Sequence, residues 1–243
     1  MSPEAPPLLE VEGLVKRFGG FRALDGLTFH LKQGEILGLV GPNGSGKTTC
    51  INVISGLYAP DGGKVRFEGR EIGGLPSHRV VHLGINRTFQ VPKPFLTLTV
   101  RENVEVANAY GRNPQGRIDA RALLASLDLD GLAERRADEL NSAQQKMLDL
   151  ARALATGPRL LLVDELAAGL NPAELERVAG RLKELARSGI ALLVVEHLMG
   201  FIDQITDRVV VMNAGREIFE GVMADAVHDG RVVEVFLGAE DAG

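Results

Sequence analysis

The sequence predicts an α/β fold with a parallel sheet at its core and two further parts attached to it. Continuous apolar runs at 36–40, 160–163 and 190–195 have the length of strands that are buried on both faces of a sheet. Residues 27–32 instead alternate apolar and polar side chains, which is typical of a strand with one wet face. Helical periodicity is concentrated between residues 91 and 157. We therefore expect one α/β core, an antiparallel β subdomain and an inserted helical subdomain.

The first third of the chain reads as strands around one helix. Residues 49–57 follow a glycine-rich loop and can continue as a helix, and the turn at 60–63 ends that segment. Val65 and Phe67 are the apolar members of a further alternating strand, and a hairpin leads from it toward Ile72. These half-polar strands favour an antiparallel sheet that lies against the core.

The middle of the chain changes to helical patterns. Two prolines exclude a helix at 90–95, because proline restricts the residue before it as well as itself. A loop is expected at 111–116, and helices are expected at 100–110, 119–127 and 142–155. We therefore assign 91–157 to a helical subdomain, and 1–90 with 158–243 to the core of a single domain that spans residues 1–243.

The last third returns to strands. Asn171 and Pro172 read as the N-cap and the first residue of a helix between the two later buried runs. A final hairpin is expected from 209–212 to 218–219, turning through 213–215. The core therefore resumes after residue 157.

A phosphate-binding loop follows the first buried run. Residues 41–49 read Gly-Pro-Asn-Gly-Ser-Gly-Lys-Thr-Thr and fit the P-loop pattern G-x-x-x-x-G-K-[ST], between a strand and a helix as the motif requires. Glycine lets the backbone approach an anion closely, and the N–H groups with the helix N-terminus form a nest for phosphate oxygens. Lys47 can reach the β- and γ-phosphates, and the Thr48 hydroxyl can ligate Mg²⁺. We expect contacts to a nucleoside triphosphate from Gly41, Asn43, Gly44, Ser45, Gly46, Lys47, Thr48 and Thr49.

Acidic side chains follow the second buried run. Asp164 can deliver a carboxylate to Mg²⁺ opposite the P-loop, and Glu165 can polarise an attacking water. Alone, such a pair is an ordinary polar end of a strand, but a P-loop upstream favours the catalytic interpretation. Glu196 and His197 end the third buried run in the same way, where His197 is suited to sense the γ-phosphate.

Composition excludes several other classes. The net charge of −5 and the lack of a basic block argue against a nucleic-acid binder. No apolar run approaches the length that crosses a bilayer, and residues 1–7 lack the apolar core of a signal peptide, so we expect a soluble, cytoplasmic chain. Cys50 reads as a small buried hydrophobe. His78 and His82 have a spacing that suits a metal, but the sequence offers no third ligand.

Taken together, the ordered motifs resemble the ATP-binding subunits of ABC transporters. The P-loop, Gln90, a signature-like stretch from Leu140, the acids at 164–165, the loop at 168–171 and His197 follow that family's order over nearly the whole chain. Further details are similar to the branch that takes up branched-chain amino acids, namely residues 84–90, 167–172, 196–197 and 233–238. Related branches carry amides or urea.

The resemblance implies roles for single residues. Phe18 corresponds to the aromatic that stacks on adenine, Glu165 to the general base and His197 to the γ-phosphate sensor. Gln90 corresponds to a residue that touches Mg²⁺ and the attacking water, so that Thr48, Gln90 and Asp164 surround the metal. Asn171 belongs to the loop that faces the partner subunit.

An assembly is implied as well. Two ATPase subunits of this family form a head-to-tail sandwich, in which each ATP lies between one P-loop and the signature of the other subunit. The sandwich drives two membrane permease subunits, and an external binding protein delivers the solute. The chain is then expected at the cytoplasmic face of the inner (cell) membrane, as a peripheral subunit.

The chain departs from the family pattern in the signature, which here reads Leu140-Asn141-Ser142-Ala143-Gln144 in place of L-S-G-G-Q or, in this branch, L-S-Y-G-Q. Asn141 removes the hydroxyl that reaches the partner's γ-phosphate, and Ala143 adds a methyl where glycine allows close approach. Leu166 replaces the usual proline after the base and frees a φ angle, and Leu198 replaces the usual aspartate. We therefore predict an asymmetric heterodimer with a partner that has an intact signature.

Two alternatives stay open from the sequence. The altered signature favours a regulatory subunit whose turnover is largely lost at one composite site, whereas the retained Lys47, Glu165 and His197 favour an energising ATPase. A soluble ABC ATPase of repair or translation usually carries two cassettes or a long coiled-coil insertion, and this sequence shows neither.

Overall fold

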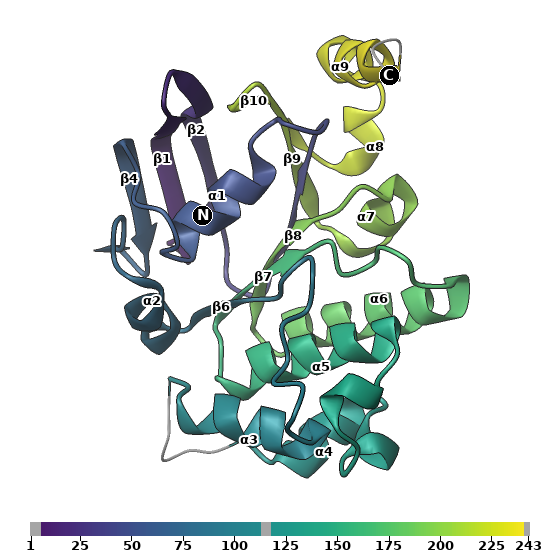
Figure 1. Cartoon of the computed structure of the whole chain (residues 1–243). Helices are drawn as coiled ribbons and strands as arrows, with labels where there is room; N and C mark the ends of the chain where they lie inside the picture. Colours follow the sequence, from purple (N-terminus) through teal and green to yellow (C-terminus); the bar gives the residue numbers. More distant parts are fainter. Residues whose placement is uncertain (1–5, 113–117, 241–243) are drawn as a thin grey trace.

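The computed structural model describes residues 6–112 and 118–240. Most of the proline-rich start and of the loop expected at 111–116 lies outside the described residues. The structure confirms the predicted fold class, with a mixed six-stranded sheet, a four-stranded antiparallel sheet and a group of helices below them (Figure 1).

The six-stranded sheet has the order β10-β9-β3-β8-β7-β6, and β10 alone runs antiparallel to its neighbour. Its strands are β3 (Ile36–Val40), β6 (Ile85–Arg87), β7 (Leu160–Asp164), β8 (Ala191–Val195), β9 (Arg208–Asn213) and β10 (Arg216–Gly221). Every residue of β3, β7 and β8 is buried. The continuous apolar runs thus form strands covered on both faces, as the sequence predicts.

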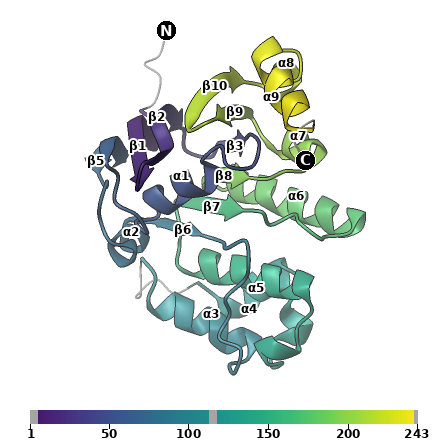
Figure 2. The same ribbon diagram turned by 45° about the horizontal axis from the view of Figure 1, so that its top comes forward.

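Each face of this sheet has its own core. Leu160, Leu162 and Leu193 pack with α1 (Lys47–Ile54) and the antiparallel sheet, and the predicted buried Cys50 lies in this layer. Leu161 and Val163 point to the opposite face, where they pack with α5 (Ser142–Ala155), α6 (Pro172–Arg187) and α7 (Met199–Ile205). Figure 2 shows α5 and α6 on that side of the sheet.

The antiparallel sheet has the order β2-β1-β4-β5. Its strands are β1 (Leu9–Phe18), β2 (Phe21–Leu31), β4 (Gly62–Phe67) and β5 (Arg70–Glu71). Buried residues of β1, β2 and β4 share one core with α1 and with β3, β7 and β8. The half-polar strands therefore pack against the α/β core, as the alternation predicts.

The helical group consists of α3 (Val100–Ala109), α4 (Ala120–Ser126) and α5, with short 3₁₀ turns at Asp130–Leu132 and Ala137–Glu139. These helices lie together at the bottom of Figure 1, away from the antiparallel sheet. We propose the subdomain boundaries 1–90, 91–157 and 158–243 on this arrangement. None of the helices in the described ranges has the length and apolar character to cross a membrane.

Several elements differ from the sequence prediction or were absent from it. The helix expected at 49–57 is α1, which begins at Lys47 and ends at Ile54, because Gly56 turns the chain with a φ of 73°. The structure also has α2 (Ser77–Leu83), β6, α7, α8 (Met223–Ala226) and α9 (Gly230–Glu240), none of which the patterns indicated. Most of these elements are short, so their sequences carry little periodicity.

Candidate nucleotide-binding and catalytic site

The P-loop connects β3 to α1 in a conformation that requires glycine. Gly46 has a φ of 107°, and a Cβ there would lie 2.5 Å from the backbone oxygen of Ala23. A Cβ on Gly41 would lie 2.2 Å from the backbone oxygen of Met212. Both positions therefore pack backbone against backbone, which only glycine permits. Within the loop, the buried hydroxyl oxygen of Ser45 has no hydrogen-bond partner among the residues that the structure describes.

Lys47 lies almost buried at the start of α1. Its Nζ donates to the carbonyl oxygen of Gly41 at 2.7 Å and to that of Pro42 at 3.0 Å, so the ammonium lies across the loop. Burial lowers the pKa of Lys47, and the charges of Glu165 and Asp164 oppose that shift. A desolvated cation inside a glycine loop is the arrangement that binds phosphate oxygens strongly.

An open cleft of about 250 Å³ lies over the P-loop. One side is formed by Phe18, Phe21 and Ala23 of the β1–β2 hairpin, and Glu165 and His197 also line it. Its other lining residues come from the P-loop and the start of α1: Asn43, Gly44, Gly46, Lys47, Thr48 and Thr49. The structure thus brings Phe18 to the P-loop, as the resemblance implies, and adds Phe21, which the sequence did not single out.

Phe18 is held by a second ring. Its ring meets that of Tyr58 edge to face, with centroids 5.2 Å apart and an interplanar angle of 76°. Phe18 and Phe21 remain 44% and 63% exposed, respectively. Two exposed aromatic rings beside a phosphate loop provide flat apolar surface for a nucleotide base.

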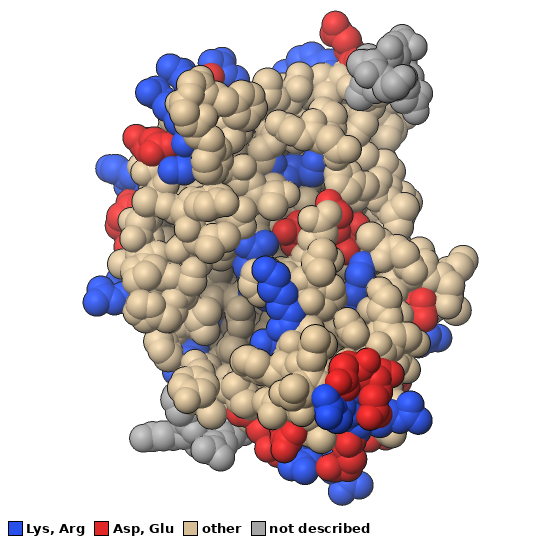
Figure 3. Space-filling view, in the orientation of Figure 1, with Lys and Arg blue, Asp and Glu red and all other residues tan. Residues whose placement is uncertain are grey.

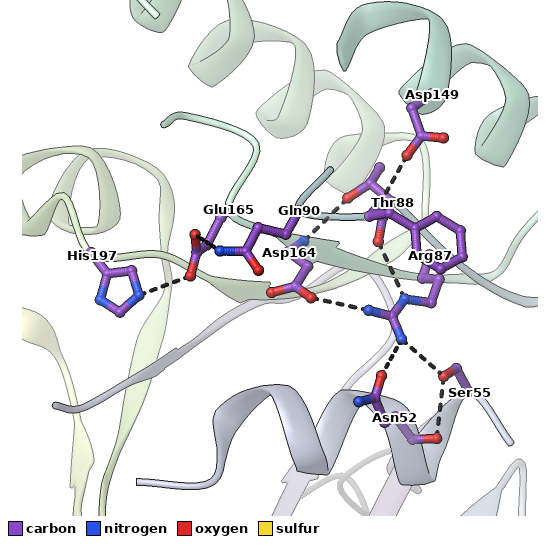
Figure 4. A network of polar contacts seen from close by, with 10 residues as sticks. Asn52, Ser55, Arg87, Thr88, Gln90, Asp149, Asp164, Glu165 and His197 are labelled. Atoms are coloured by element: carbon purple, nitrogen blue, oxygen red, sulfur yellow. Dashed lines mark hydrogen bonds and ion pairs between the residues drawn. The ribbon is translucent and has the colours of Figure 1, made fainter. Parts of the chain in front are cut away.

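Three side chains that the sequence marks as catalytic meet at the ends of neighbouring strands (Figure 4). Glu165 follows β7, Gln90 lies beyond β6 and His197 follows β8. Gln90 Nε2 donates to one carboxylate oxygen of Glu165 at 2.6 Å, and His197 Nε2 lies 2.9 Å from the other. The carboxyl ends of parallel strands meet at one edge of a sheet, which explains how residues 75 positions apart come together.

Asp164 ends β7 beside a cation that the sequence analysis missed. Arg87 Nη2 lies 3.0 Å from Asp164 Oδ2, and both side chains are largely buried. Arg87 also donates to Asn52 Oδ1 in α1 at 2.5 Å. Burial raises the pKa of Asp164, while the neighbouring Arg87 lowers it. The only signal for this ion pair in the sequence is a cation three residues before Gln90.

The residues predicted around Mg²⁺ carry suitable donors. Thr48, Gln90 and Asp164 present a hydroxyl, an amide and a carboxylate oxygen, which hard cations prefer. Thr48 lines the cleft, whereas Asp164 faces Arg87 and Gln90 faces Glu165. His78 and His82 belong to no group of three or more His, Cys, Asp or Glu side chains suited to a metal in the described parts of the chain.

A second hollow adjoins the ion pair. Arg87, Phe89, Phe95 and Arg152 line a groove of about 300 Å³, and the Arg87 guanidinium lies 4.7 Å from the centre of the Phe89 ring. Figure 3 shows basic side chains in the hollowed centre of this face, beside acidic ones. Arg87 therefore lines this groove and also forms the ion pair with Asp164.

The signature residues lie apart from the P-loop cleft. Asn141 is the N-cap of α5, where its Oδ1 accepts from the Gln144 N–H at 2.9 Å and its own N–H donates to Gln144 Oε1 at 3.1 Å. Asn141 and Ser142 are exposed. Asn141, Ala143 and Gln144 line a different pocket, which shares no lining residue with the P-loop cleft.

Residues 24–168 match the family model for ABC transporters. The chain belongs to the ABC transporter family. It is 39% identical to a probable branched-chain amino acid transport ATP-binding protein LivG of Archaeoglobus fulgidus, over 97% of each chain. It is 35% identical to the high-affinity branched-chain amino acid transport ATP-binding protein BraF of Pseudomonas aeruginosa, over 96% of this chain and 98% of the relative.

Solved structures give the same assignment. A nucleotide-free ATP-binding cassette from an ABC transporter is 32% identical, with a TM-score of 0.85 over 95% of this chain and 99% of that one. The ADP conformation of another such cassette is 33% identical, with a TM-score of 0.86 over 96% of this chain and 100% of that one. The family and the fold thus agree with the resemblance that the motifs indicate.

Proposed function

We propose that this chain is the ATP-binding and ATP-hydrolysing subunit that energises a membrane importer for branched-chain or other hydrophobic amino acids. The observation that carries the proposal is the set of Gln90, Glu165 and His197 beside the P-loop cleft. The substrate class follows from the names of LivG and BraF, to which the chain is similar over nearly its whole length. Amides or urea are the substrates of related branches and are not favoured by these relatives.

We propose one orientation for ATP in the cleft. The adenine stacks on Phe18, the phosphates lie on the N–H groups of residues 41–49, and Lys47 neutralises the β- and γ-phosphates. Thr48, Gln90 and Asp164 would hold Mg²⁺, which would neutralise charge at the same phosphates. The loop conformation that only glycine permits at Gly41 and Gly46 supports this placement.

Glu165 is the general base of the proposed reaction. Glu165 lines the cleft, and its carboxylate is held between Gln90 and His197, which orient it. The carboxylate takes a proton from the attacking water, and Gln90 orients that water. In the proposed reaction, His197 contacts the γ-phosphate.

The test of this proposal is the Glu165→Gln variant. It keeps the shape and the hydrogen bonds of the side chain but loses the base, so ATP should still bind. Single-turnover hydrolysis should fall at least tenfold, which corresponds to about 1.4 kcal/mol in the barrier. An unchanged single-turnover rate would show that another group removes the proton.

The proposal includes an assembly. The chain pairs head to tail with a second ATPase subunit, presents residues 141–144 to the partner's γ-phosphate, and drives two permease subunits supplied by a solute-binding protein. It acts as a peripheral subunit at the cytoplasmic face of the inner membrane. The separation of the signature from the chain's own P-loop cleft supports a role in the site of another subunit.

The altered signature supports a heterodimer, because a homodimer would contain two altered sites. A regulatory subunit without turnover is the weaker alternative, since the base and its two supporting side chains are in contact.

A further inference from the structure

The loop that follows β7 is bound from the signature helix by a buried lysine. Lys146 lies on α5 and is 7% exposed. Its Nζ donates to the carbonyl oxygens of Glu165 at 3.1 Å, Leu166 at 3.2 Å and Ala168. An ammonium has three donors, so these carbonyls use all of them.

A buried carboxylate binds the same loop from another element. Glu196 follows β8, is 2% exposed, and its Oε1 accepts from the Ala167 N–H at 2.7 Å. Burial raises the pKa of Glu196 to about 7, although the positive charge of Lys146 favours its ionised form. Four consecutive residues, 165–168, thus have a backbone group bound by either Lys146 or Glu196.

The loop begins in an unfavourable backbone conformation. Glu165 has a φ of 50°, which lies in the left-handed region that residues other than glycine rarely adopt. Such a conformation persists only where the surroundings hold it. Here the Glu165 N–H donates to the Val195 carbonyl at 2.9 Å, and its own carbonyl accepts from Lys146. The backbone of Glu165 is therefore fixed on both sides.

We propose that Lys146 and Glu196 are positioning residues that hold the backbone of residues 165–168 and thereby place the Glu165 carboxylate against Gln90 and His197. This inference rests on the proposed role of Glu165 as the general base. We call Lys146 and Glu196 together the brace of this loop. The loop depends more on the brace because Leu166 stands where a proline would restrict the backbone. Lys146 lines neither the cleft nor the P-loop, so its loss should impair the chemical step and spare nucleotide binding.

The test compares Lys146→Met with Lys146→Gln and with Lys64→Met, an exposed lysine on β4 that serves as the matched control. Methionine keeps the length of the side chain without a donor, whereas glutamine keeps an NH₂ group that can donate twice. In the transporter complex, Lys146→Met should lower kcat at least tenfold and change the KM for Mg-ATP less than twofold. Lys146→Gln should recover part of kcat, and Lys64→Met should leave both constants unchanged.

Hydrogen exchange of the Ala167 amide provides a readout that does not depend on activity. The amide should be protected in the wild-type chain, should exchange faster in Lys146→Met and Glu196→Leu, and should stay protected in Glu196→Gln, which retains an acceptor. An unprotected Ala167 amide in the wild type would overturn the proposal even if the variants failed to fold. The proposal would also be overturned if Lys146→Met had the same kcat and the same Ala167 exchange rate as the wild type.

Glu165→Gln, measured beside these variants, separates the two proposals. If it keeps full activity, Glu165 is not the base, and the exchange data alone decide whether the brace exists. If it is inactive while Lys146→Met is fully active, the base is confirmed and the brace is rejected.

Discussion

Replacing Arg87 with methionine should destabilise the chain strongly, because the change leaves Asp164 buried without its cation. The side chains of Arg87 and Asp164 are 10% and 3% exposed. Removing one partner of a buried ion pair costs about 3–5 kcal/mol, far more than the loss of a surface pair. Arg87→Met also removes the hydrogen bond to Asn52, so we expect a loss near the upper end of this range.

The pH dependence of this loss has a definite sign. Burial raises the pKa of Asp164 and Arg87 lowers it, so the pKa must rise further in the variant. A carboxyl group whose pKa is higher in the folded state costs no stability at low pH, where it is protonated in both the folded and the unfolded state. As pH rises from the unfolded-state pKa to the folded-state pKa, the free energy of unfolding falls. The difference in stability between wild type and Arg87→Met should therefore be larger at pH 7 than near pH 4.

Urea unfolding at the two pH values measures this difference, and the double variant Arg87→Met/Asp164→Asn is its control. Removing both charges avoids the isolated buried anion, so the double variant should recover much of the stability at pH 7. A loss below 1 kcal/mol in Arg87→Met, or a double variant no more stable than the single one, would refute the reasoning.

Three further predictions concern other parts of the site. Lys47→Ala should weaken ATP binding in a titration by removing the charge-assisted contact to the phosphates, and equal affinities would contradict the P-loop assignment. Glu196, which faces Lys146, Glu165 and the Ala167 N–H, has a pKa raised by burial from 4.5 to about 7. The folded state therefore binds more protons between these values, and stability should fall by about 3 kcal/mol as pH rises through them. The free energy of unfolding of Glu196→Gln, measured with urea, should lack this fall with pH. If wild type and variant showed the same pH dependence, the titration of Glu196 could not be its cause. Restoring Asn141→Ser and Ala143→Gly together should raise ATPase activity several-fold, whereas no change would make both residues harmless variants.

The sequence was sufficient for those elements that are continuously apolar or whose ends carry a chemical signal. Residues 160–163 and 190–195 could be read as buried strands because both faces of the sheet are covered, and Asn171 is the N-cap of α6 as its Asn-Pro pair indicates. The short α2 and β6 could not be read, because seven and three residues give no clear period.

The charged residues that support the site were harder to find. Arg87 lies in a short strand and Lys146 in a helix, where an isolated cation usually reads as a solvent-exposed residue. Arg87 meets Asp164 across 77 positions, and Lys146 meets the carbonyls of Glu165, Leu166 and Ala168 across 19 to 22. These partners come together only through the packing of β6, β7 and α5, which no local pattern in the sequence specifies.

Two of the changes in the signature, Asn141 and Ala143, should differ in their consequences. Asn141 caps α5 through its carbonyl oxygen, and asparagine is as good an N-cap as serine. Its amide group also keeps two N–H donors, so position 141 retains both the helix start and the chemistry for binding a phosphate oxygen. Ala143 lies one residue before Gln144 in the first turn of the same helix, where we expect its methyl to separate the backbone from an approaching phosphate. The gain from the double restoration should therefore come mainly from Ala143→Gly, and Asn141→Ser alone should change the ATPase rate little. A larger effect of Asn141→Ser than of Ala143→Gly would show that the serine hydroxyl, and not backbone access, limits this site.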